Sequence, residues 1–172
     1  MPARSARFLE NNSFYHITVR GRHRLFECSK DYRFYLHILK KHKGHFQIKI
    51  YGFCLTSESM QIILQCETAQ HLSTYMQFIN EVYAFYFNGK YKRKGKLYQE
   101  RFKGILLKGE QEVRAALREM ELWPVHLQLS DSPADYPWSS YDLRMAGHYD
   151  GILDPLFPGF SIDDSCFDSP PK

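Results

Sequence analysis

Residues Tyr51–Gln65 constrain the fold of this chain more than any other stretch. They are typical of two apolar strands joined by the short polar turn Thr56-Ser57-Glu58. Because side chains alternate between the two faces of a strand, Met60, Ile62 and Leu64 are expected to point into a core. The opposite face of the second strand then carries Ser59, Gln61, Ile63 and Gln65.

The rest of the chain supplies further strands and helices around this hairpin. Alternation predicts a first strand at Ser13–Val19 and a last one at Arg101–Lys108. Apolar residues at three- and four-residue spacing predict helices at Asp31–Lys43, His71–Asn88 and Glu110–Leu122. Asn88-Gly89 is expected to end the second helix, and Trp123-Pro124 the third. The order β-α-β-β-α-β-α predicts an α+β fold, a ferredoxin-like antiparallel sheet with helices packed on one face.

Composition sets the class of protein and its domains. With 172 residues, 44% of them hydrophobic and 16% aromatic, the chain is expected to be globular. We expect one domain over residues 1–149 and an irregular acidic tail over residues 150–172. No apolar run approaches the roughly 20 residues that span a bilayer, and the N-terminus lacks a signal-peptide pattern. A cytoplasmic protein without a membrane partner is therefore expected.

The net charge of +4 conceals an uneven distribution. The tail holds five Asp residues and one Lys, which leaves 22 basic and 14 acidic residues in the rest of the chain. That surplus favours a polyanionic partner, and two segments concentrate it. The cations that we expect to contact nucleic acid are Arg4, Arg7, Arg20, Arg22, Arg24, Lys90, Lys92, Arg93, Lys94, Lys96, Arg101 and Lys103. Tyr91 or Tyr98 could stack on unpaired bases between them.

Cysteines and histidines do not form a metal-site pattern. The four cysteines (Cys28, Cys54, Cys66 and Cys166) include no Cys-x-x-Cys pair, and reduced, mostly buried thiols are expected. None of the eight histidines belongs to a His-x-His pair. His42 and His45 are expected to be solvated at a helix end, and His16 to make a local hydrogen bond on the first strand.

Five segments occur in an order and spacing shared with one known family. They are Tyr-His-Ile-Thr-Val-Arg-Gly at 15–21, Phe-Cys-Leu at 53–55, Met-Gln at 76–77 continuing to Tyr-Phe-Asn at 86–88, Gly-Lys-Leu-Tyr-Gln-Glu-Arg-Phe-Lys at 95–103, and Asp-Tyr-Pro-Trp-Ser-Ser-Tyr at 135–141. Over about residues 8–145 the chain resembles the single-tyrosine transposases of the IS200 kind, and most closely the REP-associated tyrosine transposases.

This resemblance implies an enzyme that cuts single-stranded DNA next to imperfect hairpins. In the family, a tyrosine attacks a phosphodiester and holds the DNA end as a phosphotyrosine. A divalent metal, held by a His-hydrophobic-His motif on a central strand, polarises the scissile phosphate. Two imidazoles two residues apart on a strand face the same way and can share one ion.

Both catalytic motifs are replaced in this chain. Ser59 and Gln61 stand at the two histidine positions, and a hydroxyl and a neutral amide are poor ligands beside imidazole. Glu58 lies nearby, but alone it would hold an ion only weakly. The family pattern Arg-Tyr-Ile-His-Leu-Asn-Pro-Val-Arg corresponds to residues 118–126, where Glu119 takes the place of the tyrosine and Trp123 that of the asparagine.

No catalytic residue and no metal ligand are therefore expected. A cofactor is not expected either, and a divalent metal (Mg or Mn) would be needed only for residual activity. Tyr83 and Tyr86 are alternative nucleophiles, but their spacing on the second helix favours core packing.

The main hypothesis is a catalytically inactive protein that binds single-stranded or hairpin DNA. A monomer is expected, because the REP-associated branch need not form the dimers of the compact IS200 branch. Two alternatives stay open. One is an active transposase with an unorthodox metal site that uses Glu58, Gln61 or Glu119. The other is a protein-interaction or regulatory module whose contact surface is the acidic tail and the aromatic turn at 135–141.

Overall fold

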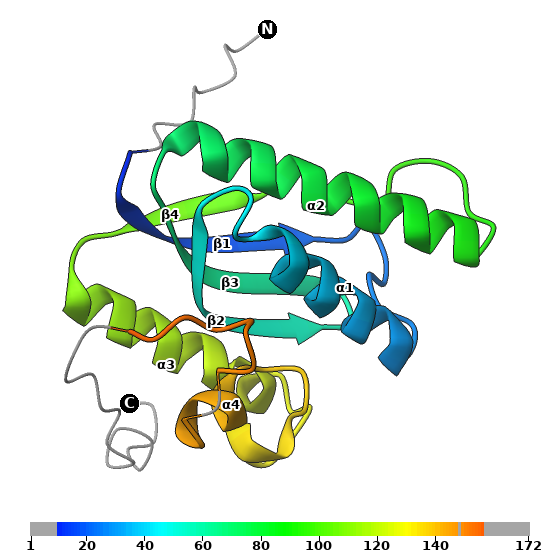
Figure 1. Ribbon diagram of the computed structural model, residues 1–172. Coiled ribbons are helices and arrows are strands. Elements are labelled where there is room, and N and C mark those ends of the chain that lie inside the picture. The colour runs from blue at the N-terminus through cyan, green and yellow to red at the C-terminus, as the bar shows by residue number, and fades with distance from the viewer. Residues whose placement is uncertain (1–9, 148, 157–172) are drawn as a thin grey trace, which may run out of the picture.

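A four-stranded antiparallel sheet forms the centre of the computed structural model, which describes residues 10–147 and 149–156 (Figure 1). The strands are β1 (Ser13–Arg20), β2 (Ile48–Thr56), β3 (Ser59–Cys66) and β4 (Lys103–Leu107). Their order across the sheet is β2-β3-β1-β4, and every neighbouring pair is antiparallel. The helices are α1 (Ser29–His42), α2 (Ala69–Lys90), α3 (Glu110–His126) and the short α4 (Tyr141–Met145), with a 3-10 turn at Pro133–Asp135. This topology confirms the predicted ferredoxin-like α+β class.

The β2–β3 hairpin lies where the alternation predicts it. Its turn consists of Ser57 and Glu58, and Met60, Ile62 and Leu64 have no exposed surface. These three side chains belong to the main core, which α1 and α2 complete with residues such as Leu39 and Tyr75. The polar side chains of β3 lie on its other face and remain partly exposed.

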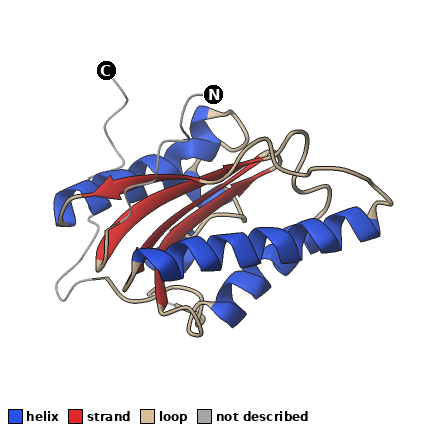
Figure 2. Ribbon diagram, turned by 90° about the horizontal axis from the view of Figure 1, so that it is seen from above, coloured by secondary structure: helices blue, strands red, loops and turns tan. Residues whose placement is uncertain are grey.

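The expectation that the helices pack on one face holds for α1 and α2 and is wrong for α3. Figure 2 shows helices on both sides of the sheet. Ile63, on the second face of β3, is fully buried in a smaller core with Val113, Leu117 and Met120 of α3. The apolar stripe of α3 predicts that the helix is buried, but a stripe carries no information about which face of a sheet it covers.

Two helices run further than their expected stops. The helix α2 continues through Gly89 to Lys90, and the left-handed residue that follows it is Lys92, with a φ of 51°. The helix α3 continues through Pro124, which is buried, to His126. In both cases tertiary contacts outweigh a local stop signal: Lys90 is held by Asp31, and the apolar ring of Pro124 is buried.

The outer edge of β2 is covered by chain from beyond α3. The amide of Leu55 donates to Trp138 O, and the amide of Ser140 donates to Phe53 O. This is the predicted aromatic turn, and it is fastened to the sheet. Further along, the amide of Asp154 donates to Ile50 O at 2.7 Å. The edge is therefore not left open for another strand at these positions.

The first part of the expected tail packs on the domain. Ile152 and Leu153 are buried in the main core. The Asp154 carboxylate accepts from Lys43 Nζ at 2.6 Å and from the amide of Ile50 at 2.8 Å. Residues 157–172 lie outside the described part of the chain. None of the helices described by the structure has the length and apolarity needed to cross a bilayer.

Gly52 of β2 provides a test of how α3 packs on the sheet. A Cβ atom there would lie 2.4 Å from Leu117 Cδ2 and 3.0 Å from Met120 Cε, both on α3. Gly52→Ala should therefore lower the free energy of unfolding by about 1–3 kcal/mol through overpacking. Gly89→Ala is the matched control, because its Cβ would meet nothing within 4 Å and its helical position favours Ala by about 0.5–1 kcal/mol. Urea unfolding of both variants measures the difference, and equal effects would contradict this packing.

Candidate functional site

Two cationic segments that are distant in sequence lie side by side in the structure. Gly21 and Tyr98 form an antiparallel bridge. On either side of it, the amide of Arg22 donates to Leu97 O at 2.9 Å, and the amide of Gln99 donates to Arg20 O at 3.0 Å. These bonds join the loop after β1 to the chain between α2 and β4. We call residues 90–96 the basic loop and residues 20–24 the β1 loop.

The predicted cations differ in their exposure and in their partners. Several are exposed and have no carboxylate partner within the described residues: Arg20, Arg22, Lys92, Lys94, Lys96 and Arg101. Two exposed cations form surface ion pairs: Arg24 lies 3.4 Å from Glu27, and Lys103 lies 2.9 Å from Glu100. Arg93 lies over the ring of Phe87. Arg4 and Arg7 lie outside the described residues.

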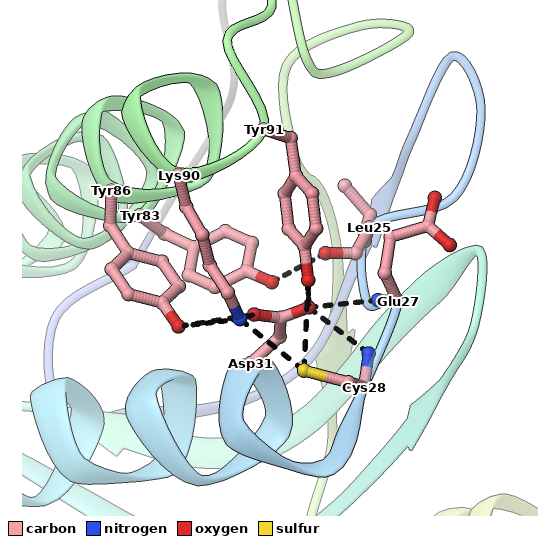
Figure 3. Close-up of polar contacts among 8 residues, drawn as sticks. All are labelled: Leu25, Glu27, Cys28, Asp31, Tyr83, Tyr86, Lys90 and Tyr91. Carbon is pink, nitrogen blue, oxygen red and sulfur yellow. Dashed lines mark hydrogen bonds and ion pairs between the residues drawn. The ribbon is translucent and has the colours of Figure 1, made fainter.

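Lys90 differs from the other cations because its ammonium group is bound inside the protein. Its Nζ donates to the carboxylate of Asp31 at 2.5 Å, and Asp31 has no exposed surface (Figure 3). The same carboxylate accepts from Tyr91 Oη at 2.7 Å and from Tyr86 Oη at 3.1 Å. Burial by itself raises the pKa of Asp31, but hydrogen bonds from Lys90, Tyr91 and two backbone amides outweigh it and lower the pKa. Asp31 also raises the pKa of Lys90.

The tyrosines near the basic loop do not form open stacking surfaces. The hydroxyl of Tyr91 is bound to Asp31, and its ring packs against Phe87 with centroids 4.6 Å apart. Tyr98 donates to Asn80 O at 3.0 Å, and burial raises its pKa. Both side chains are only partly exposed. Their hydroxyls, and the ring of Tyr91, contact other parts of the protein.

The alternative nucleophiles Tyr83 and Tyr86 are packed as the helical spacing predicts. Tyr83 is fully buried, its hydroxyl donates to Leu25 O, and burial raises its pKa. The hydroxyl of Tyr86 donates to Asp31, and its ring stacks on Phe34. A phenol with a raised pKa and an internal hydrogen-bond partner is a weak nucleophile.

Cys28 is the exception to the expectation of mostly buried thiols among the cysteines in the described part of the chain. Cys54 and Cys66 are buried as expected, and burial raises the pKa of Cys54 to about 12. Cys28 is exposed at the N-cap of α1. Tyr91 Oη lies 3.6 Å from its sulfur and Lys90 Nζ lies 3.3 Å away, and these two contacts lower the pKa of the thiol.

The two β3 residues that the family resemblance aligns with metal-binding histidines, Ser59 and Gln61, form hydrogen bonds within the protein. His16 Nε2 and Gln61 Oε1 form a hydrogen bond with a length of 2.8 Å. This contact is the local hydrogen bond expected of His16. Ser59 Oγ lies 2.8 Å from Thr56 Oγ1. The donor set is thus one imidazole, one amide and one hydroxyl, each already engaged with a protein partner.

These residues do not fit a catalytic divalent ion. The amide of Gln61 and the hydroxyl of Ser59 are poor ligands for a divalent ion, and the one imidazole beside them, that of His16, is hydrogen-bonded to Gln61. Across residues 10–147 and 149–156, no three His, Cys, Asp or Glu side chains lie close enough to share an ion. Glu58 and Glu119 are exposed.

Glu121, two residues after Glu119, is the buried carboxylate of α3. It accepts from Ser140 Oγ at 2.7 Å and from Arg144 Nε at 3.1 Å, and it forms an ion pair with the same arginine. Ser140 Oγ in turn accepts from the amide of Phe53 in β2. This network ties α3 to α4 and to the covered edge of the sheet, which is a structural role. Burial lowers the pKa of Arg144 to about 10.

The pH dependence of the reactivity of the Cys28 thiol tests whether the Lys90 ammonium lies next to it. In a Cys166→Ser background, Cys28 should react with a disulfide reagent at a lower pH than an ordinary thiol, since the thiolate is the reacting form. Lys90→Met removes a stabilising cation, so the pH midpoint of the reaction rate should rise. Lys41→Met, at the other end of α1, should leave the midpoint unchanged. An equal midpoint in the Lys90 and Lys41 variants would contradict the Lys90–Cys28 contact.

Comparisons with known proteins identify the family of this chain and a solved structure with the same fold. Among curated protein sequences, none is similar enough to count as a relative. A solved REP-associated tyrosine transposase bound to a REP hairpin is 19% identical, with a TM-score of 0.70; the match covers 91% of this chain and 93% of that one. A putative transposase from Deinococcus radiodurans R1 is 14% identical with a TM-score of 0.47, covering 67% of this chain and 93% of that one. The family described as "Transposase IS200 like" matches residues 10–122, more than half of the chain. This protein therefore belongs to the IS200-like transposase family.

Proposed function

We propose that this protein binds single-stranded or hairpin DNA through the β1 loop and the basic loop, and that it does not cleave the strand. The observation that supports the proposal is the bridge between Gly21 and Tyr98, which joins the backbones of two segments that carry exposed cations. Phosphates are the ligands that such a surface recognises, because each neutralised phosphate releases condensed counterions.

We propose more specifically that the ligand is a DNA hairpin of the REP kind. The solved structure with a TM-score of 0.70 is a REP-associated tyrosine transposase bound to a REP hairpin, and the match covers 91% of the present chain. The shared fold makes the same class of ligand the first to test. We therefore propose that this protein belongs to the REP-associated branch.

The side chains on this surface favour binding to the phosphate backbone of DNA over recognition of its bases. The exposed side chains of the two loops are mainly Arg and Lys, and the two nearby tyrosines are bound to Asp31 and Asn80. Phosphate contacts position a protein on nucleic acid but carry little sequence information. Affinity should therefore depend steeply on salt.

The absence of cleavage rests on the chemistry of three positions. Gln61 and Ser59 replace metal-binding histidines and are bonded to His16 and Thr56. Glu119, an exposed carboxylate, cannot form the phosphotyrosine linkage of the family. Without a polarising ion and a tyrosine nucleophile, neither half of the family reaction is supplied.

Fluorescence anisotropy with a labelled hairpin oligonucleotide tests binding. Arg22→Gln combined with Lys94→Gln should weaken binding about tenfold and reduce the slope of log K against log salt by about 1.4–1.8, since each lost phosphate contact contributes about 0.7–0.9. Lys41→Gln removes an exposed cation at the other end of α1 and should change affinity less than about twofold. No detectable binding of the unmodified protein at low salt would overturn the proposal.

Cleavage is tested separately on the same hairpin with magnesium or manganese. The expected result is intact oligonucleotide and no covalent protein–DNA adduct on a denaturing gel. An active relative that retains the two histidines and the tyrosine serves as the positive control. An adduct formed by the present protein would refute the inactive assignment while leaving the binding proposal in place.

A further inference from the structure

The first residues of the basic loop, Lys90 and Tyr91, contact the buried acidic residue Asp31. Asp31 has no exposed surface, and its carboxylate accepts hydrogen bonds from two different parts of the chain. The amides of Glu27 and Cys28, at the start of α1, donate to Oδ2 at 2.9 and 3.1 Å. Lys90 and Tyr91, at the end of α2, donate to Oδ1 and Oδ2 (Figure 3). The carboxylate is thus the link between the N-terminus of α1 and the point where the basic loop leaves α2.

We propose that Asp31 is the positioning residue of the nucleic-acid surface, holding the basic loop in the conformation that presents its cations. This inference rests on the proposed DNA binding. Lys90 belongs to the anchor in this arrangement, so it does not contact phosphate. The loop cations that remain for an anion are Lys92, Lys94 and Lys96, beside Arg22.

The conformation of the loop depends on fixing both of its ends. At its start, the chain reverses at Lys92, which has a φ of 51°, and the amide of Arg93 donates to Asn88 O at 2.9 Å. Such a left-handed backbone is strained for a residue other than glycine, and surrounding contacts must stabilise it. At its end, Leu97 is buried and its carbonyl accepts from Arg22. Asp31 supplies the contacts at the first end.

Asn88 connects the two ends of the loop. Its Nδ2 donates to Gly95 O at 3.2 Å, across the tip of the loop. Gly95 has a φ of 93°, in the region that favours glycine. If Lys90 and Tyr91 lost their carboxylate partner, the last turn of α2 would fray, and this side-chain bond would lose its fixed geometry.

The direction in which DNA affinity changes when the Asp31 charge is removed distinguishes a positioning role of Asp31 from a purely electrostatic effect. Asp31→Asn keeps the shape of the side chain and raises the net charge of the protein by one. Long-range electrostatics alone would make such a variant bind DNA more tightly. Loss of the anchor predicts the opposite, because a loosened loop must be ordered again on binding, at an entropic cost.

The experiment compares Asp31→Asn with Glu100→Gln, which makes the same charge change at an exposed site in the segment after the basic loop. We expect Asp31→Asn to weaken binding to the hairpin oligonucleotide about tenfold and Glu100→Gln to leave it unchanged or slightly tighter. Tyr91→Phe, which removes one hydroxyl from the network, should weaken binding in the same direction by a smaller factor. It also keeps the test available if Asp31→Asn does not fold.

Hydrogen exchange of the free protein gives a readout that does not depend on DNA. Amides of residues 91–98 should exchange faster in Asp31→Asn and Tyr91→Phe than in the unmodified protein, while those of β3 should not change. Unchanged exchange in these residues, or a folded Asp31→Asn that binds as tightly as Glu100→Gln, would overturn the inference. If the unmodified protein binds no hairpin, the proposed function fails, and exchange alone then decides whether Asp31 holds the loop.

Discussion

The burial of β3 between two layers of helices is the constraint on which the rest of the structure depends. Met60, Ile62 and Leu64 fill the face under α1 and α2, and Ile63 fills the face under α3. The polar side chains of β3 lie on the second face and remain partly exposed. Among them, Gln61 is hydrogen-bonded to His16. The apolar residues on both faces of β3 thus hold the sheet between its two layers of helices.

Two buried carboxylates hold the outer parts of the molecule to this sheet. Asp31 joins α1 to the end of α2, and Glu121 joins α3 to Arg144 and to Ser140 at the covered edge of β2. A buried charge is tolerated only when its partners are complete, so each carboxylate holds several segments in one geometry. The first of these networks sets the start of the basic loop, so a buried anion organises a surface that carries cations.

Much of the candidate site follows from local patterns, and some of it cannot. Strand alternation identified the core face of β3, and charge runs identified the cations of the β1 loop and the basic loop. The end of α2 was misplaced because Asn88-Gly89 is a local stop signal, whereas Lys90 is held by Asp31 from another helix. Tyr91 and Lys90, from the same distant part of the chain, lower the pKa of the exposed Cys28 thiol. Sequence alone does not show which of two adjacent cations is paired internally.

The sequence by itself determined the ferredoxin-like class, the hairpin and the membership of the IS200-like family, because these depend on residue periodicity and on motifs read along the chain. Only the tertiary structure decided that α3 lies on the second face of the sheet and that the β1 loop meets the basic loop at Gly21 and Tyr98. It also decided that Lys90 serves as an anchor. These features depend on contacts between residues far apart in the chain, and no local pattern specifies which distant groups will meet.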